Sequence, residues 1–375
     1  MNVLTSDFET TTFSNGSPFD SRNKAVCLAM KQDARDTVCT FDLTKLNFSV
    51  VSKDDLYVFF NAKYDLHWYR KLGVDIGSWK VYCCQVAEFI LSGQTQPYPS
   101  LEQTAQKYGL GHKIDAIKLD YWDKGINTDA IPQDILGDYC KQDVDLTYQI
   151  YLKQKEQFEA NPKLYALLKL QMYDLLVLEE MEWNGLLYNE ELCVERSKDI
   201  EKRLEELYSE FTKFHDGVPL NLNSGDQLSA FLYGGVVQEE VKEHIGFFKT
   251  GAKAGQPKYK NVTKEHILPR LVEPLKGTEL KKEGYWKTDE ATLRKLKGKA
   301  ATKFVGPLLE IAKLEKLNST YYKGLPAKNK EGCWKEGYIY GQYNQCVAAT
   351  GRLSSSKPNL QNFSGECLDI FVSRY

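Results

Sequence analysis

Short apolar runs separated by turn residues make up the first 60 residues of the chain. The runs at 3–8, 25–30 and 37–41 are rich in β-branched and apolar residues, and turn-type residues stand between them. The run at 57–60 is apolar throughout, which is typical of a strand buried on both faces. The pattern therefore predicts four strands.

Helical patterns follow these strands and continue to about residue 157. The expected helices cover 62–72, 80–92, 100–108 and a long segment that opens at Pro132. Proline is favoured in the first turn of a helix, where its missing N–H is not needed. Strands followed by helices predict an α/β domain, with a mixed sheet and helices on its faces.

The pattern changes from Pro162 onwards. Helical periodicity is expected in four later segments, at 162–183, 190–214, 289–297 and 301–320. The stretch 234–287 holds many Gly, Lys and Pro residues and predicts an irregular insertion, either β-rich or a loop. The last 40 residues alternate again between apolar and polar positions.

Composition fits a folded, non-membrane protein of two or three domains. Of 375 residues, 42% are hydrophobic and 27% are charged. No run of 18 uncharged apolar residues occurs, so no membrane span is expected, and the N-terminus lacks the order of a signal peptide.

Charge is distributed unevenly. Residues 1–150 hold 20 acidic and 15 basic residues, a net charge of −5, whereas 241–300 holds 15 basic and 7 acidic residues, a net charge of +8. An acidic N-terminal segment fits a metal site, and a basic segment at 241–300 fits a polyanion-binding surface. A solvated face is the alternative for the basic stretch.

The nine cysteines form no C-x-x-C pair. This usage predicts reduced thiols in a cytoplasmic protein. Cys83 and Cys84 are adjacent, but no histidine or second cysteine pair stands near them, so buried small side chains are favoured over metal ligands.

Two carboxylates stand at the end of the first predicted strand, in Asp7-x-Glu9. Side chains two residues apart on a strand point to the same face. The two charges repel each other unless a cation lies between them, and Mg²⁺ and Mn²⁺ prefer oxygen ligands of this kind. The motif by itself is common on protein surfaces.

Two further motifs carry a carboxylate. Asn61 and Asp65 follow directly after the buried strand, where ligands gather in α/β sheets, although Asp65 could equally be an ordinary helix-start carboxylate. Tyr139 and Asp143 share one helix face at i and i+4, although Tyr139 could equally be a packing residue.

Together the three motifs resemble those of the DnaQ-like (DEDD, tyrosine subtype) 3′–5′ exonucleases. The positions that this family uses are all filled, by Asp7, Glu9, Asp65, Tyr139 and Asp143. The resemblance implies a ribonuclease H-like fold and hydrolysis of a phosphodiester with two ions, Mg²⁺ or Mn²⁺.

The same resemblance implies a role for each residue. Asp7, Glu9 and Asp143 would hold the ion that generates hydroxide. Asp7 would bridge to the second ion, near Asp65, where the leaving 3′ oxygen is stabilised. Tyr139 would orient the attacking water. By the same analogy, the residues expected to touch the single-stranded 3′ end of the DNA are Thr10 and Asn61.

A second resemblance covers the rest of the chain. Residues 349–362 read A-T-G-R-L-S-S-S-K-P-N-L-Q-N, which is close to the T-A-T-G-R-L-S-S-x-x-P-N-L-Q-N signature of family A (polymerase I-type) DNA polymerases. Residues 164–188 resemble the helix that leaves the exonuclease domain of that family. Residues 221–228 and 309–326 resemble its thumb.

This resemblance implies a DNA-binding role for the C-terminal half. Arg352 would approach the minor groove near the primer end, with Gln361 and Asn362 assisting, so that the chain grips a primer-template duplex. The basic insertion at 234–287 would contact phosphates. The implied organisation is an exonuclease domain at 1–157, a mostly α-helical thumb at 158–335 and the first palm segment at 336–375.

The resemblance stops at residues 371–375, just before the segment in which the family carries its first polymerase aspartate. The expectation is a bacteriophage polymerase split into two polypeptides, the second carrying the remaining palm and the fingers, or else a truncated product. Two alternatives compete with this interpretation. A ribonuclease D-type exonuclease acting on RNA is disfavoured by the palm signature. A non-catalytic DNA-binding subunit is disfavoured by the intact carboxylates.

Overall fold

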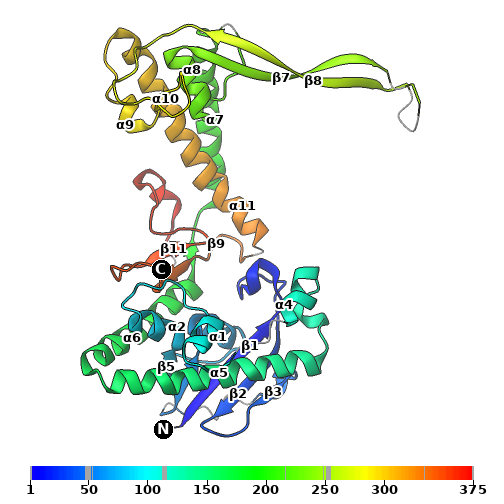
Figure 1. The fold of residues 1–375 in the computed structure, drawn as a ribbon, viewed down its shortest axis with the longest axis vertical. Helices are drawn as coiled ribbons and strands as arrows, with labels where there is room; N and C mark the ends of the chain where they lie inside the picture. Colours follow the sequence, from blue (N-terminus) through cyan, green and yellow to red (C-terminus); the bar gives the residue numbers. More distant parts are fainter. Residues whose placement is uncertain are drawn as a thin grey trace. The chain divides into compact units, whose positions relative to one another are not determined.

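The chain forms two compact units (Figure 1). The computed structural model describes residues 2–46, 52, 54–111, 116–215, 217–247, 249–250, 255–332 and 334–373. The first unit comprises Met1–Glu190 with Pro326–Tyr375, and the second comprises Glu191–Leu325. Two residues of the predicted palm end, Arg374 and Tyr375, lie outside the described residues, as does Cys333.

A five-stranded mixed sheet forms the centre of the first unit. Its strands, in chain order, are β1 (Val3–Thr10), β2 (Ala25–Gln32), β3 (Val38–Thr40), β4 (Leu56–Phe59) and β5 (Lys80–Cys83). Their spatial order is β3-β2-β1-β4-β5. The β1–β2 and β2–β3 pairs are antiparallel, and the β1–β4 and β4–β5 pairs are parallel. The mixed sheet that the sequence predicts is confirmed.

Helices cover this sheet. They are α1 (Ala62–Lys71), α2 (Cys84–Leu91), α3 (Leu101–Lys107), α4 (Ala116–Asp120), α5 (Gln133–Glu159) and α6 (Pro162–Asn184). The long helix α5 packs against β1, β2 and β3. Its buried Leu136, Cys140 and Val144 share a cluster with Cys27 and Ala29 of β2, because these three positions recur on one face of the helix.

The helix predicted at 80–92 is wrong in its first part, because Lys80–Cys83 is the edge strand β5. Its residues Val81 to Cys83 are buried and pair in parallel with β4. A short apolar run fits a buried strand and a helix equally well when only periodicity is considered. The other predicted strands and helices of this unit are confirmed, at β1–β4, α1, α3, α5 and α6.

The C-terminal segment of the first unit forms small sheets. The strand β9 (Tyr338–Ile339) pairs with β6 (Leu186–Leu187), and β10 (Gln342–Asn344) pairs with β11 (Ser354–Ser356). The helix α11 (Gly324–Glu331) precedes them. The compact units divide the chain at Glu190 and Leu325. The division at 157 and 335 is a functional prediction based on resemblance.

The second unit is mostly helical, with one long ribbon. Its elements are α7 (Glu190–Thr212), α8 (Gly225–Tyr233), β7 (Gly235–Phe247), β8 (Pro257–Leu268), α9 (Glu290–Leu293) and α10 (Lys299–Leu317). Phe211, Phe231 and Phe304 pack edge-on or tilted in its core. The strands β7 and β8 form an antiparallel ribbon that extends beyond α8 (Figure 1). The predicted β-rich insertion is thereby confirmed, whereas the helix expected at 289–297 is only four residues long.

No helix in the described part of the chain combines the length and the apolar character needed to cross a bilayer.

Helix α3 begins with a capping box whose contribution to the free energy of unfolding should be measurable. The Ser100 hydroxyl accepts from the Gln103 N–H at 3.1 Å, and the Gln103 side chain accepts from the Ser100 N–H. Replacing Ser100 by Ala should lower the free energy of unfolding by about 1 kcal/mol, because an N–H of the first turn loses its partner. Urea unfolding measures this, with the exposed Ser21→Ala as control. Equal losses in the two variants would contradict the cap.

Candidate active site

The side chains of β1 alternate between an apolar face of the sheet and a face that carries carboxylates. The Phe8 ring packs edge-on against the Tyr69 ring of α1, at 4.8 Å between centroids. Its neighbours Asp7 and Glu9 project to the other face, since side chains alternate along a strand. The carboxylates of Asp7 and Glu9 and the thiol of Cys140 offer ligand atoms within 4.8 Å of one another. The first motif is thus an acidic pair beneath α5.

Helix α1 adds a third carboxylate. Its first turn follows β4 directly and carries Asp65, whose Oδ1 accepts a hydrogen bond from the Phe8 N–H at 3.1 Å. Asp65 is only 2% exposed. Burial, together with the charge of nearby Asp7, raises the pKa of Asp65 well above its usual range. The parallel strands β1 and β4 therefore bring two sequence motifs to one point.

Helix α5 closes the site on the other side. The thiol of Cys140 lies 3.4 Å from the backbone oxygen of Asp7, which places this turn of the helix against β1. Tyr139 and Asp143 belong to the same stretch of α5, and both are buried. The Tyr139 ring also packs edge-on against Trp122, at 6.0 Å between centroids. The third motif is thus on the helix that contacts Asp7.

The two residues expected to touch the DNA end lie in different environments. Thr10 is buried, and its hydroxyl is 2.5 Å from the Tyr64 hydroxyl. Asn61 is exposed and lines a cavity of about 420 Å³ within the first unit. Tyr64 lines the same cavity, as do Phe19 and Tyr340, whose rings stack at 4.3 Å between centroids. Thr10 can therefore act on this cavity only through Tyr64.

The three predicted palm residues lie apart from the carboxylates. Arg352, Gln361 and Asn362 are exposed on the C-terminal segment of the first unit. Among the described residues, they belong neither to the carboxylate group nor to the lining of the cavity. Their side chains form part of the surface of the first unit.

A buried charged cluster between α1 and α6 was not predicted from the sequence. Its members are Lys63, His67 and Arg70 on α1 and Glu179 and Glu182 on α6. The Lys63 ammonium donates to Glu182 at 2.5 Å and also to the Tyr343 backbone oxygen. The Arg70 Nε lies 2.8 Å and 3.0 Å from the two Glu179 oxygens. The three basic residues recur at positions i, i+4 and i+7 on α1, and the two acidic residues stand three positions apart on α6. Each set therefore shares one helix face, and this spacing is the sequence signal that could have indicated the cluster.

His67 in this cluster should produce a measurable pH dependence. Burial lowers its pKa from 6.5 to about 3, with the charges of Lys63 and Arg70 acting in the same direction. Between those values the unfolded chain binds a proton that the folded chain does not, so stability is lost as the pH falls below 6.5. His67→Gln should remove up to about 1.4 kcal/mol per pH unit of that slope between pH 6 and pH 4. Urea unfolding across this range measures it, and parallel profiles for the two proteins would contradict it.

Comparison with known proteins tests the interpretation of the C-terminal half. Residues 263–369 match the model of DNA polymerase family A. In this segment the chain is similar to the family A DNA polymerases. DNA polymerase I of Synechocystis sp. is 28% identical over 308 residues, which cover 80% of this chain and 26% of that protein. DNA polymerase DpoZ of Salmonella phage PMBT28 is 24% identical over 323 residues, covering 80% of this chain and 45% of that protein.

A solved family A polymerase structure shares the fold. The POL domain of Pol1 from M. smegmatis, in complex with DNA primer-template and dNTP, superimposes with a TM-score of 0.66 over 97% of this chain and 52% of that chain, at 16% identity. The chain spans 26% and 29% of the full-length DNA polymerase I proteins of Synechocystis sp. and Pseudomonas aeruginosa. The likeness to this solved structure is one of fold, whereas the family model matches residues 263–369, which include the predicted palm signature.

Proposed function

We propose that the first unit is a 3′–5′ exonuclease of ribonuclease H-like fold, the proofreading part of a family A DNA polymerase. The observation that carries this proposal is the set of carboxylates along β1, where Asp7 and Glu9 lie together beneath α5 and Asp65 accepts from the N–H of Phe8 between them. A buried group of like charges is unfavourable unless a cation or a proton compensates it.

The donor set fits hard divalent cations. Asp7, Glu9 and Asp65 all offer oxygen, and burial together with the charge of Asp7 raises the pKa of Asp65, so a nearby cation would stabilise its charged form. Asp7, Glu9, Asp65 and Asp143 would hold two Mg²⁺ or Mn²⁺ ions, which supply the acidification of a water and the neutralisation of charge on the leaving oxygen.

The protein's own groups would position the substrate. Tyr139 stands four residues before Asp143 on the same face of α5, so its phenol can orient a water for in-line attack. Asn61 stands at the N-cap of α1, the helix that carries Asp65, and would contact the terminal nucleotide from that position.

The remainder of the chain would bind the primer-template duplex. Arg352, Gln361 and Asn362 are exposed, as a surface that contacts DNA requires. The net charge of +8 in 241–300 would add contacts to phosphates that do not depend on sequence. A completing polypeptide and a location in the cytoplasm of a bacterial host remain predictions from the sequence.

The choice between DNA and RNA tests the proposal against the ribonuclease D alternative. Single strands of the same sequence, one DNA and one RNA, are incubated with the full chain and Mg²⁺, and the products are separated on a gel. Preferential shortening of DNA supports the proposal. Preferential shortening of RNA would favour the alternative.

Arg352 should contribute to duplex affinity equally for all sequences. The minor groove presents similar acceptors in every base pair, so a contact there tests pair geometry. Arg352→Ala should weaken primer-template binding by about 1 kcal/mol, roughly fivefold in Kd, on every duplex tested. Fluorescence anisotropy measures this, with the exposed Arg35→Ala as control. Unchanged affinity, or a loss confined to some sequences, would contradict the assignment.

A further inference from the structure

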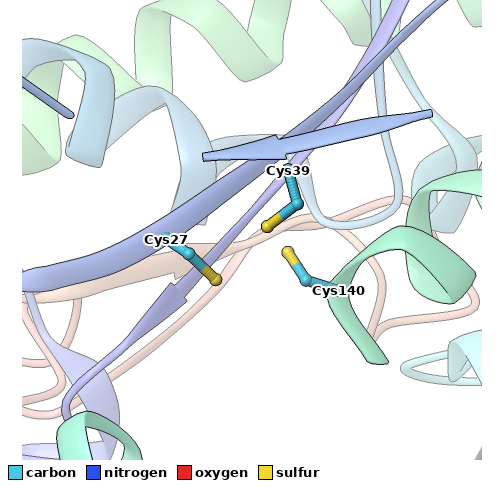
Figure 2. A group of neighbouring side chains, drawn as sticks. All are labelled: Cys27, Cys39 and Cys140. Carbon is cyan, nitrogen blue, oxygen red and sulfur yellow. The ribbon is translucent and has the colours of Figure 1, made fainter. Parts of the chain in front are cut away.

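Three cysteines from distant parts of the chain meet beside the carboxylate group. Cys27 lies on β2, Cys39 on β3 and Cys140 on α5. Their sulfur atoms lie within 4.8 Å of one another, and Figure 2 shows that all three side chains point toward a common centre. We call these residues the thiol cluster.

The register of the sheet explains why they meet. Cys27 lies opposite Glu9 in the β1–β2 pair, and Cys39 lies opposite Ala29 in the β2–β3 pair. Residues directly opposite in an antiparallel pair share a face, and so do residues two apart on a strand. Cys27 and Cys39 therefore lie on the carboxylate face of the sheet. Helix α5 covers this face and contributes Cys140.

The surroundings distinguish the thiol cluster from the carboxylate site. Cys27 and Cys140 are fully buried among apolar side chains that include Ile117, Leu136 and Val144. Cys39 is the partly exposed member. Sulfur ligands select soft cations such as Zn²⁺ and Cu⁺, whereas carboxylate oxygens select Mg²⁺ and Mn²⁺.

We propose that Cys27, Cys39 and Cys140 form a binding site for one thiophilic cation of the Zn²⁺ class, next to the carboxylates of Asp7 and Glu9, each of which has a ligand atom within 4.8 Å of the Cys140 sulfur. Binding forms three metal–sulfur bonds and releases the thiol protons to solvent. Zn²⁺ prefers four ligands, and the fourth position would be filled by water on the side of the partly exposed Cys39. The bound ion joins β2, β3 and α5, and so fixes the helix that carries Tyr139 and Asp143.

A spectroscopic titration tests this site without reference to nuclease activity. The full chain, reduced and freed of reductant under inert gas, is titrated with Cd²⁺ in excess Mg²⁺, so that the carboxylates hold the hard ion. The expected result is a thiolate-to-Cd²⁺ charge-transfer band that saturates at one equivalent, with a rise in Tm, because a ligand that binds only the folded state stabilises it. No saturating band, or no rise in Tm, would overturn the proposal.

Matched variants locate the site. Cys39→Ser should lose the saturating band and the rise in Tm, whereas Cys193→Ser, which alters another buried thiol, should keep both. Retention of the band in Cys39→Ser would overturn the proposal.

A measurement on the unaltered chain avoids any folding defect of the variants. Zn²⁺ should slow alkylation of Cys39 at least tenfold, and an unchanged rate would overturn the site. Because none of these readouts requires DNA cleavage, failure of the nuclease proposal would leave them interpretable.

Discussion

Asp7→Ala is expected to reduce the rate of 3′-end hydrolysis by at least about 100-fold. Asp7 is the carboxylate that links the other two. Its ligand oxygen lies within 4.8 Å of that of Glu9, and its charge, together with burial, raises the pKa of Asp65. Charge stabilisation by bound ions contributes several kcal/mol to a transition state, and about 3 kcal/mol corresponds to a factor of 100. Single-turnover rates on 5′-labelled DNA, at saturating Mg²⁺, measure the effect.

A second acidic residue serves as the control for this prediction. Asp138 lies on α5 in the same unit, but its side chain is 77% exposed and pairs with Lys141. Asp138→Ala removes the same charge from the same unit and should change the rate by less than about twofold, since exposed pairs of this kind contribute little. Similar rates for Asp7→Ala and the unaltered chain would remove Asp7 from the active site.

Arg70→Ala is expected to be the most destabilising of the substitutions considered. Arg70 keeps 24% of its side chain exposed, whereas Glu179, its partner, has none exposed. Removing the arginine leaves a buried carboxylate without its compensating charge, and breaking a buried pair in this way costs about 3 kcal/mol. Urea unfolding at pH 7, followed by tryptophan fluorescence, measures the loss.

The physical origin of that loss can be tested with a second substitution. Adding Glu179→Gln to Arg70→Ala replaces the buried charge with a neutral amide and should restore part of the stability. Lys24→Ala, which breaks the exposed pair with Asp129, should change the free energy of unfolding by less than about 1 kcal/mol. A loss for Arg70→Ala as small as that for Lys24→Ala would show that burial does not govern the cluster.

The sequence was informative where the signal is local. The alternation and apolar runs of β1 to β4 identify strands directly, and the carboxylates Asp7, Glu9 and Asp65 stand next to those strands, so their convergence follows from the order of strands in the sheet. The strand β5 is not predicted, because its short apolar run continues directly into the helical pattern of α2, and periodicity alone does not separate a buried strand from a helix. Its neighbour β4 is predicted from the unbroken apolar run at 57–60, which is typical of a strand buried on both faces.

Features that depend on tertiary contacts were not predictable in the same way. The thiol cluster joins Cys27, Cys39 and Cys140, whose spacing matches no local metal motif. Only the β2–β3 register and the docking of α5 bring them together. For Arg70 and Glu179, the spacing of charges marks a charged face on each helix, but which faces meet depends on how α6 lies against α1.

The most direct test of the central claim is the polarity of degradation by the unaltered chain. Single-stranded DNA with a 5′ label is incubated with the full chain and Mg²⁺, beside the same strand carrying a blocked 3′ end. We predict a ladder that shortens from the 3′ end of the free strand, no shortening of the blocked strand, and no ladder with Asp7→Ala. Full-length DNA in every lane, or a ladder that is unaffected by the 3′ block, would contradict a 3′–5′ exonuclease at Asp7, Glu9 and Asp65.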